Sequence, residues 1–289
     1  MLRQKSFAQE LPTIYLVPTP IGNLEDMTFR SVRILKEVEV IFAEDTRVSQ
    51  KLMSHFEIKG QLRSYHEHNK HVATEEILNL LKEGKNVALI SDAGMPLLSD
   101  PGFEIVQKAR EQGYNVVALP GANAVLTGLV TSGIQVLPFT FLGFLDNKKT
   151  KRQKELEELK YRKETLVFYE APHRLKELLE DMYIIFGDRV ISITRELTKT
   201  FEEIIHGPIS ECMTLEPLKG EMVIVVSGNQ EKEFLHSELS IVDQVDFFIK
   251  DGLTKTEAMK RVSALTGLPK NKIYQDYLQT KVSSKNKSL

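Results

Sequence analysis

The sequence predicts an α/β fold with two domains, a parallel-sheet N-terminal domain over residues 12–134 and a mixed-sheet second domain over residues 135–229. A small helical module is expected over residues 240–281. In the first region short apolar segments alternate with amphipathic ones, which is typical of a parallel sheet covered by helices. The second region has fewer helix-sized segments per strand, which favours a mixed sheet. The last region has three short helical segments separated by glycines.

The first domain begins with an apolar segment at residues 13–17, which predicts a buried strand that ends at Pro18. Two prolines and a glycine cannot continue a strand, so residues 18–23 form a turn. Asp45 is expected to cap one helix, and Asp100 followed by Pro101 to begin another that runs through Gln112. Further strands are expected at 40–42, 87–90 and 116–119, and further helices at 28–37, around 77–81 and at 123–132.

The same patterns predict the strands and helices of the second domain and of the module. Expected strands are 139–142, 165–169, 190–194, 201–206 and 221–227, and expected helices are the basic segment 148–163 and residues 175–186. A polar linker at 228–239 precedes expected helices at 242–250, 255–265 and 269–279, and residues 283–289 are expected to be disordered. Thr254 and Glu257 have capping-box spacing. The module resembles a helix-turn-helix, although a dimerisation or packing appendage has the same pattern.

Charge is distributed unevenly along a chain whose formal net charge is −2. Residues 148–163 hold eight basic and three acidic residues, and residues 240–289 hold nine basic and five acidic residues. Such segments suit contact with a phosphate backbone, and they equally suit solvated helix faces. The single cysteine, Cys212, cannot form an internal disulfide. With no apolar run of the roughly 20 residues that span a bilayer and no signal peptide, the protein is expected to be cytoplasmic, without a membrane partner.

Standard nucleotide and metal motifs are not found. The sequence has no GxGxxG after its first strand, no GxxxxGK[ST] and no HExxH. The histidines of residues 66–71 could be read as metal ligands, but a polar surface loop is the better interpretation, and no metal is expected. Three turns, at 18–23, 91–102 and 120–124, follow predicted strands and are rich in small residues. Ligands bind at the carboxyl ends of parallel strands, so these turns predict a small-molecule site without defining its reaction.

Four segments resemble the tetrapyrrole methylase superfamily. They are VPTPIGNLEDMT, LISDAGMPLLSDPG, ALPGANA and LVFYEAPHR. Within the superfamily the chain is most similar to the family of ribosomal RNA small subunit methyltransferase I, through IFAEDTRVSQKL, SYHEHNK, TRELTKTFEEIIHGPI and KGEMVIVVSG. The resemblance covers residues 11–228, and the C-terminal helices look like the family's helix-turn-helix tail.

The resemblance implies a two-domain fold with S-adenosylmethionine in the cleft between the domains. It implies methylation of the ribose 2′-hydroxyl of a cytidine in the decoding region of 16S rRNA, presented as naked RNA or as the small ribosomal subunit, and it implies a homodimer. Matching turns imply that ten residues bind the cofactor: Pro20, Asp92, Ala93, Gly94, Leu97, Asn123, Ala124, Tyr169, Glu170 and Leu197. The second turn reads DAGMP where the tetrapyrrole-modifying branch tends to have GGDP, so side-chain contacts there can differ.

Methyl transfer to a hydroxyl requires alignment of the reacting atoms and removal of a proton. Glu170 or Asp45 is the expected group for polarising the hydroxyl, and Arg47 is expected to contact a phosphate. Alternatively, Asp45 only caps its helix and Arg47 forms a surface ion pair. Two alternative functions stay open: a superfamily methyltransferase that acts on a tetrapyrrole or a protein, and a non-catalytic RNA-binding module with a vestigial cofactor pocket.

Overall fold

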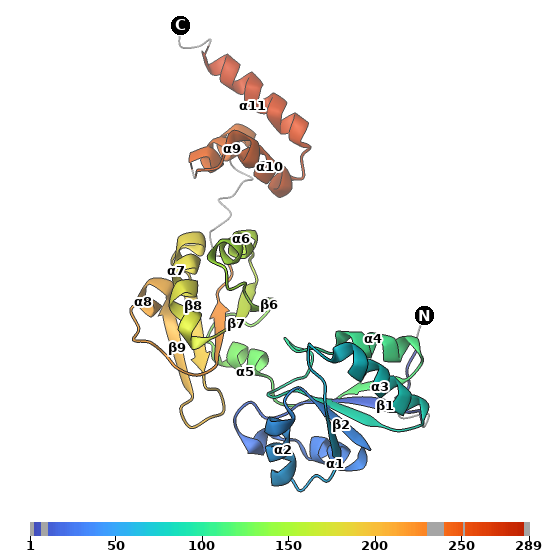
Figure 1. Cartoon of the computed structure of the whole chain (residues 1–289). Coiled ribbons are helices and arrows are strands. Elements are labelled where there is room, and N and C mark those ends of the chain that lie inside the picture. The colour runs from blue at the N-terminus through green and yellow to red at the C-terminus, as the bar shows by residue number, and fades with distance from the viewer. Residues whose placement is uncertain (1–2, 7–10, 230–239, 251, 286–289) are drawn as a thin grey trace. The chain divides into compact units, whose positions relative to one another are not determined.

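The computed structural model describes residues 3–6, 11–229, 240–250 and 252–285. The chain divides into two compact units, residues 1–229 and 230–289. The first unit contains two sheets (Figure 1). Each has five strands, in the orders β3-β2-β4-β1-β5 and β6-β7-β10-β8-β9. Among the described residues, no helix combines the length and apolar character needed to cross a lipid bilayer.

The first sheet is parallel throughout, as its alternation of strands and helices predicts. Helices cover both faces: α3 and α4 pack on one and α1 and α2 on the other, each with its own core cluster. The strands therefore run with their carboxyl ends at one edge, where the turns that follow them gather. The elements are β1 (Thr13–Val17), α1 (Phe29–Glu37), β2 (Val40–Ala43), α2 (Thr46–His55), β3 (Gln61–Ser64), α3 (Lys70–Lys82), β4 (Val87–Ile90), α4 (Phe103–Glu111) and β5 (Asn115–Ala118).

Two features of the first sheet differ from the prediction. Strand β3 was not expected, because it is a polar, largely half-exposed edge strand without an apolar run. Helix α4 begins at Phe103 with Gly102 as its N-cap, so the prediction that Asp100 caps this helix was wrong. The backbone of Gly102 has φ +142°, which is incompatible with a helix that starts at Pro101.

The second sheet is mixed, as predicted. Strands β6 and β7 are parallel, and the other three pairs are antiparallel. One face is covered by α6, α7 and α8 around a core cluster that includes Leu156, Leu178 and Met182. The elements are β6 (Phe139–Phe144), α6 (Lys149–Leu159), β7 (Thr165–Glu170), α7 (Leu175–Phe186), β8 (Val190–Arg195), β9 (Glu203–Pro208), α8 (Ile209–Cys212) and β10 (Met222–Val226), with short 3-10 turns at Leu24–Asp26 and Pro172–Arg174.

Helix α5 (Ala124–Thr131) follows the last strand of the first sheet but packs on the second sheet. Val125 and Leu129 join Val167 of β7 and Val223 of β10 in one apolar cluster. Gly128 allows this close approach, because a Cβ there would lie 2.7 Å from Thr194 Oγ1 and 3.1 Å from Val223 Cβ. The helix therefore connects the turn that precedes it to the opposite sheet.

The second unit is a three-helix module, built from α9 (Ile241–Lys250), α10 (Lys255–Thr266) and α11 (Lys270–Lys285) around Val245, Phe248 and Val262. The predicted capping box between Thr254 and Glu257 is confirmed, and Gly267 ends α10 in a left-handed conformation. Helix α11 continues through Lys285, so the prediction of disorder was wrong for residues 283–285, which contain no Gly or Pro to end the helix. Residues 286–289 and most of the predicted linker lie outside the described residues.

Candidate functional site

A cavity of about 370 Å³ lies between turns of the first sheet and strands of the second. Its volume is in the range of sites for small ligands. One part of its wall comes from the turns after β1, β4 and β5, and the other comes from β6, β7, β8 and β10 and the residues that flank them. The lining residues are Ile21, Asp92, Ala93, Gly94, Met95, Leu98, Ser99, Asp100, Asn123, Ala124, Phe144, Tyr169, Glu170, Ala171, Pro172, Thr194, Leu197, Glu221, Met222 and Val223.

The first wall is formed largely by backbone. Thr19 and Gly94 exchange two backbone hydrogen bonds of 3.0 Å each, which hold the turns after β1 and β4 together. The Ser91 hydroxyl donates to the Gly94 carbonyl at 2.9 Å. Gly94 has φ +78°, and a Cβ there would lie 3.1 Å from Ile21 Cγ2. Glycine therefore serves both the conformation of the turn and its close packing.

The third turn is held by a helix cap. The side chain of Asn123 accepts a hydrogen bond from the backbone N–H of Leu126 at 2.9 Å and so begins α5. Asn123 and Ala124 both line the cavity. Because α5 packs on the second sheet, this turn is tied to both walls.

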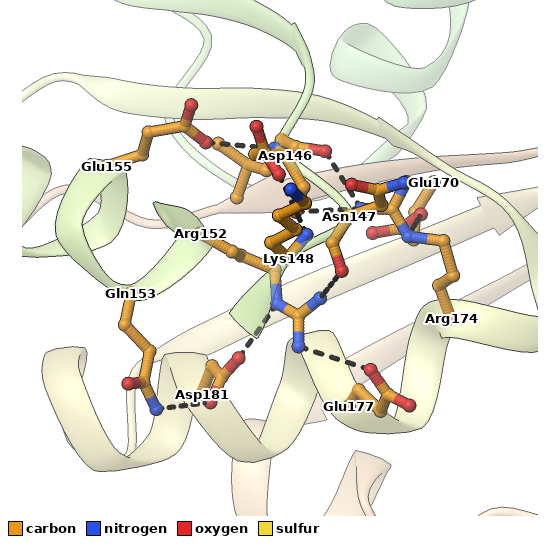
Figure 2. Close-up of polar contacts among 11 residues, drawn as sticks. Asp146, Asn147, Lys148, Arg152, Gln153, Glu155, Glu170, Arg174, Glu177 and Asp181 are labelled. Atoms are coloured by element: carbon orange, nitrogen blue, oxygen red, sulfur yellow. Dashed lines mark hydrogen bonds and ion pairs between the residues drawn. The ribbon is translucent and has the colours of Figure 1, made fainter. Parts of the chain in front are cut away.

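The second wall is formed by side chains, among which Glu170 at the end of β7 is the most buried carboxylate. Figure 2 shows Glu170 with its neighbour Arg174. Glu170 is 2% exposed, and its Oε1 accepts a hydrogen bond from the Ala171 N–H at 2.8 Å. Arg174 Nε lies 3.4 Å from the same oxygen, whereas Oε2 has no hydrogen-bond partner among the described residues. Burial raises the pKa of Glu170, although the hydrogen bond from Ala171 and nearby Arg174 oppose the shift.

Asp100 adds a second perturbed carboxyl group to the cavity. Burial, followed by repulsion from Glu44 and Asp92, raises the pKa of Asp100 to about 6. Burial, with Asp100 and Glu221 nearby, raises the pKa of Tyr169 to about 12. Titratable groups with shifted pKa values inside a cavity are a mark of functional sites.

Comparisons with known proteins agree with this architecture. The family model described as Tetrapyrrole (Corrin/Porphyrin) Methylases matches residues 13–212. Ribosomal RNA small subunit methyltransferase I of Bacillus subtilis is 50% identical, with 95% of this chain and 98% of the relative covered. The protein of that name from Halalkalibacterium halodurans is 48% identical, with coverage of 96% and 100%. The chain belongs to the ribosomal RNA small subunit methyltransferase I family of tetrapyrrole methylases.

Solved structures support the same fold. A cobalt precorrin-4 methyltransferase superposes with a TM-score of 0.57 at 17% identity, covering 74% of this chain and 94% of its own. At this level of identity the likeness concerns the fold alone. The family resemblance stated from the sequence motifs is thus confirmed, as is the two-domain α/β fold.

The structure brings together eight of the ten residues that the family resemblance suggests for cofactor binding. Pro20 and Leu97 are not part of the cavity wall, which instead includes their neighbours Ile21 and Leu98. Leu97 has φ +74°, and its side chain is directed toward Gly102, where a Cβ would lie 3.0 Å from Leu97 Cγ. Leu97 therefore packs within its turn, away from the cavity wall.

Asp45 and Arg47 lie outside the cavity wall. Asp45 caps α2 by accepting from the Arg47 N–H at 2.8 Å, and its carboxylate also accepts from the Arg47 guanidinium at 3.0 and 2.6 Å. This hydrogen bonding lowers the pKa of Asp45 to about 2. The Arg47 side chain is 88% exposed. Asp45 reaches the site indirectly, because its backbone N–H donates to Asp92 Oδ1 at 3.0 Å.

The histidine-rich segment forms a polar loop and the start of α3. Asn69 donates to the Ser64 carbonyl at 3.0 Å, and His71 pairs with Glu104 at 3.0 Å. No three His, Cys, Asp or Glu side chains in the described part of the chain are arranged to hold a metal ion.

Several lining residues were not predicted as site residues. Phe144, Thr194 and Asp100 are examples. Phe144 lies in no motif, whereas Thr194 begins the segment TRELTKTFEEIIHGPI but is not distinguished there from an ordinary strand residue. For Asp100 a signal did exist, because it ends the glycine-rich turn after β4, but the following proline suggested a helix cap. The remaining wall arises from strand pairing, which aligns Met222 of β10 with Glu170 of β7.

Proposed function

We propose that this chain is an S-adenosylmethionine-dependent methyltransferase that acts on the ribose 2′-hydroxyl of a cytidine in the decoding region of 16S rRNA. The cavity carries the methyltransferase part of the proposal, because it combines a wall of backbone turns with a wall of titratable side chains. Relatives named for the small-subunit RNA, similar over nearly the whole chain, support the acceptor.

The residues present fit S-adenosylmethionine. The turns at Gly94 and Ala124 leave room for a ligand close to the backbone, and Asp92 and Asp100 offer carboxylates to ribose hydroxyls and to positive charge. Glu170 Oε2 is buried without a protein partner, so a donor or a cation is needed there. We propose that the cofactor contacts are Asp92, Ala93, Gly94, Asn123, Ala124, Tyr169, Glu170 and Leu197, with Pro20 and Leu97 as supports. When bound, S-adenosylmethionine supplies an electrophilic methyl group.

Glu170 is the proposed proton acceptor for the attacking hydroxyl. Its Oε1 is fixed by Ala171, its Oε2 is free, and its raised pKa makes it a stronger base than an ordinary carboxylate. Asp45 and Arg47 do not line the cavity, and the Asp45 carboxylate is paired with the Arg47 guanidinium, so neither is assigned this role. We propose instead that Asp45 positions Asp92 and that Arg47 contacts an RNA phosphate from the exposed rim.

The test is methyl transfer from labelled S-adenosylmethionine to three acceptors: small ribosomal subunits, naked 16S rRNA and a porphyrinoid. We expect one methyl group on the RNA, at a cytidine whose 2′-position resists alkaline hydrolysis. Transfer to the porphyrinoid or to protein alone would show that the acceptor is not RNA. Failure to bind S-adenosylmethionine by calorimetry would indicate a non-catalytic RNA-binding module.

A homodimer is part of the proposal. On α5, Leu126 and Val130 are 50% and 64% exposed, and Leu137 nearby in sequence is 68% exposed. Exposed apolar side chains of this size suit a protein interface. Sedimentation equilibrium of the wild type and of Val130→Glu tests it, with a dimer expected only for the wild type.

The three-helix module is proposed to contact RNA. Its exposed lysines include Lys255, Lys260 and Lys270. If so, a chain that ends before Ser240 keeps its affinity for S-adenosylmethionine and loses affinity for RNA.

A further inference from the structure

Phe144 is an exposed aromatic residue at the edge of the cavity. It ends β6, lines the cavity and is 54% exposed, which is unusual for a large apolar side chain beside a buried wall. Its ring lies 5.4 Å from that of Tyr169, which in turn packs edge-on against Phe141 at 4.9 Å. Phe144 is therefore the outer member of a row of three aromatic rings.

Helix α6, which follows this strand after a short loop, has its charges arranged against its dipole. Lys149 and Lys151 lie in its first turn, whereas Glu157 and Glu158 lie toward its end. The N-cap residue, Lys148, forms no side-chain cap. Cations at a helix N-terminus are unfavourable, whereas anions are stabilised there. Asp146, just before the helix, offsets part of this charge, because it accepts from the Lys148 N–H at 2.8 Å and pairs with Lys151 at 3.4 Å. The exposed ammonium groups of Lys148 and Lys149 form no ion pair with a carboxylate among the described residues.

Two arginines hold the loop between Phe144 and α6 in place (Figure 2). Arg174 donates to the carbonyls of Leu145 and Asp146 at 2.8 and 3.2 Å, and Arg152 donates to that of Asn147 at 3.5 Å. Arg152 is 1% exposed and is itself fixed by Asp181 at 2.8 Å. The loop is thus preorganised, and its outward lysines are free of the ion pairs that neutralise the buried arginine.

We propose that residues 144–149 form a binding subsite for one unpaired nucleotide of the RNA acceptor. Phe144 stacks on the base, and the exposed ammonium groups of Lys148 and Lys149 bind the adjoining phosphate. A paired base cannot present its face to a side chain, so the nucleotide must be single-stranded or turned out of its helix. The inference rests on the proposed function and names how that site recognises its substrate.

The sequence offers a direct probe, because the chain contains no tryptophan. Phe144→Trp places a single fluorophore in the subsite, and Phe29→Trp places one on α1, where Phe29 is 97% exposed. Titration with a single-stranded oligoribonucleotide that carries the acceptor cytidine should quench the first variant and leave the second unchanged. The same oligonucleotide annealed to its complement should quench neither. Equal quenching of both tryptophans, or of neither, would overturn the proposal.

Activity gives the second readout. Phe144→Ala should raise KM for the RNA about tenfold, as expected for loss of one base stack, and Phe144→Tyr should restore it. Lys148→Ala with Lys149→Ala should raise the same KM and weaken its dependence on salt. The affinity for S-adenosylmethionine, measured by calorimetry, should stay unchanged in each variant.

The outcomes separate this inference from the proposed function. If the wild type methylates no RNA, the proposed function fails. If the wild type methylates RNA and Phe144→Ala is equally active with an unchanged melting temperature, only the nucleotide subsite fails. Weaker binding of S-adenosylmethionine by Phe144→Ala would assign the ring to the cofactor and also overturn the subsite.

Discussion

The two walls of the cavity differ in which atoms form them: backbone atoms form most of the first, and side chains form the second. The first consists of turns such as that at Gly94, where neighbouring turns are joined by backbone hydrogen bonds. The second consists of strand side chains, including Tyr169 and Glu170, whose pKa values are raised by burial. Parallel strands with glycine-rich turns expose backbone, whereas the pairing of β7 with β10 presents rows of side chains.

This difference suits the two walls to different roles. A backbone wall tolerates many side-chain changes but no added bulk, which suits the binding of one invariant cofactor. A side-chain wall can be changed residue by residue, which suits adaptation to an acceptor and to proton transfer. Substitutions in the first wall should therefore act mainly on cofactor affinity, and substitutions in the second should also affect turnover.

The largest expected effect is from Gly94→Arg. The new side chain would meet Ile21 within the turn and fill the cavity, so affinity for S-adenosylmethionine should fall by about 100-fold or more. Gly113→Arg is the matched control, since Gly113 has φ +83° with open space around the position of a Cβ. Calorimetry and thermal unfolding distinguish a blocked site from a strained backbone. Equal loss of affinity in both variants would contradict the role of the turn.

Glu170→Gln should reduce turnover far more than it weakens cofactor affinity. The amide can still accept from the Ala171 N–H but cannot take a proton, so kcat should fall about 100-fold. Single-turnover kinetics with labelled cofactor measure the effect, and Glu158→Gln on the exposed face of α6 is the control. A kcat close to that of the wild type would require another proton acceptor.

Asp100 should make cofactor binding depend on pH. Its carboxyl ionises at a pKa of about 6, so attraction for the cationic cofactor should increase from about pH 5 to pH 7, raising affinity up to tenfold. Asp100→Asn should abolish this dependence. Calorimetry across the pH range checks it, and a slope that persists in the variant would assign the titration to another group.

Asp100 should also make the free energy of unfolding depend on pH. Folding raises the pKa of Asp100 from 3.8 to about 6, so the folded chain binds more protons in this window. The carboxyl therefore destabilises the fold increasingly as the pH rises through the window. Asp100→Asn should stabilise the protein at pH 7, by about 1 kcal/mol after allowance for partial exposure, and much less near pH 4. Denaturant unfolding at the two pH values measures the difference.

The smallest effect is expected from Arg47→Ala, since this residue lies outside both walls. Loss of one exposed phosphate contact should raise KM for RNA about threefold and leave kcat unchanged. Steady-state kinetics at low and moderate salt test this. A large fall in kcat would indicate that Arg47 and Asp45 take part directly in methyl transfer.

The sequence predicts the backbone wall better than the side-chain wall. Local chemistry determines a turn such as residues 91–94, where small residues follow a buried strand, and the periodicity of residues 175–186 predicts α7 with its observed bounds. The second wall depends on pairing between distant strands, which places Met222 opposite Glu170, and no local pattern encodes that register. Strand β3 was missed for a related reason, because its polar sequence becomes a strand only beside β2.

The packing of α5 on the second sheet has a consequence for recombining parts of this protein. A chimera that joins this N-terminal half to the second half of a distant relative, with a crossover near residue 134, would separate Leu129 from its partners Val167 and Val223. It would also set a foreign side chain against Gly128, where no Cβ fits. A crossover before Gly121 would instead transfer the helix together with the sheet that it covers, and with it one of the three turns that form the pocket.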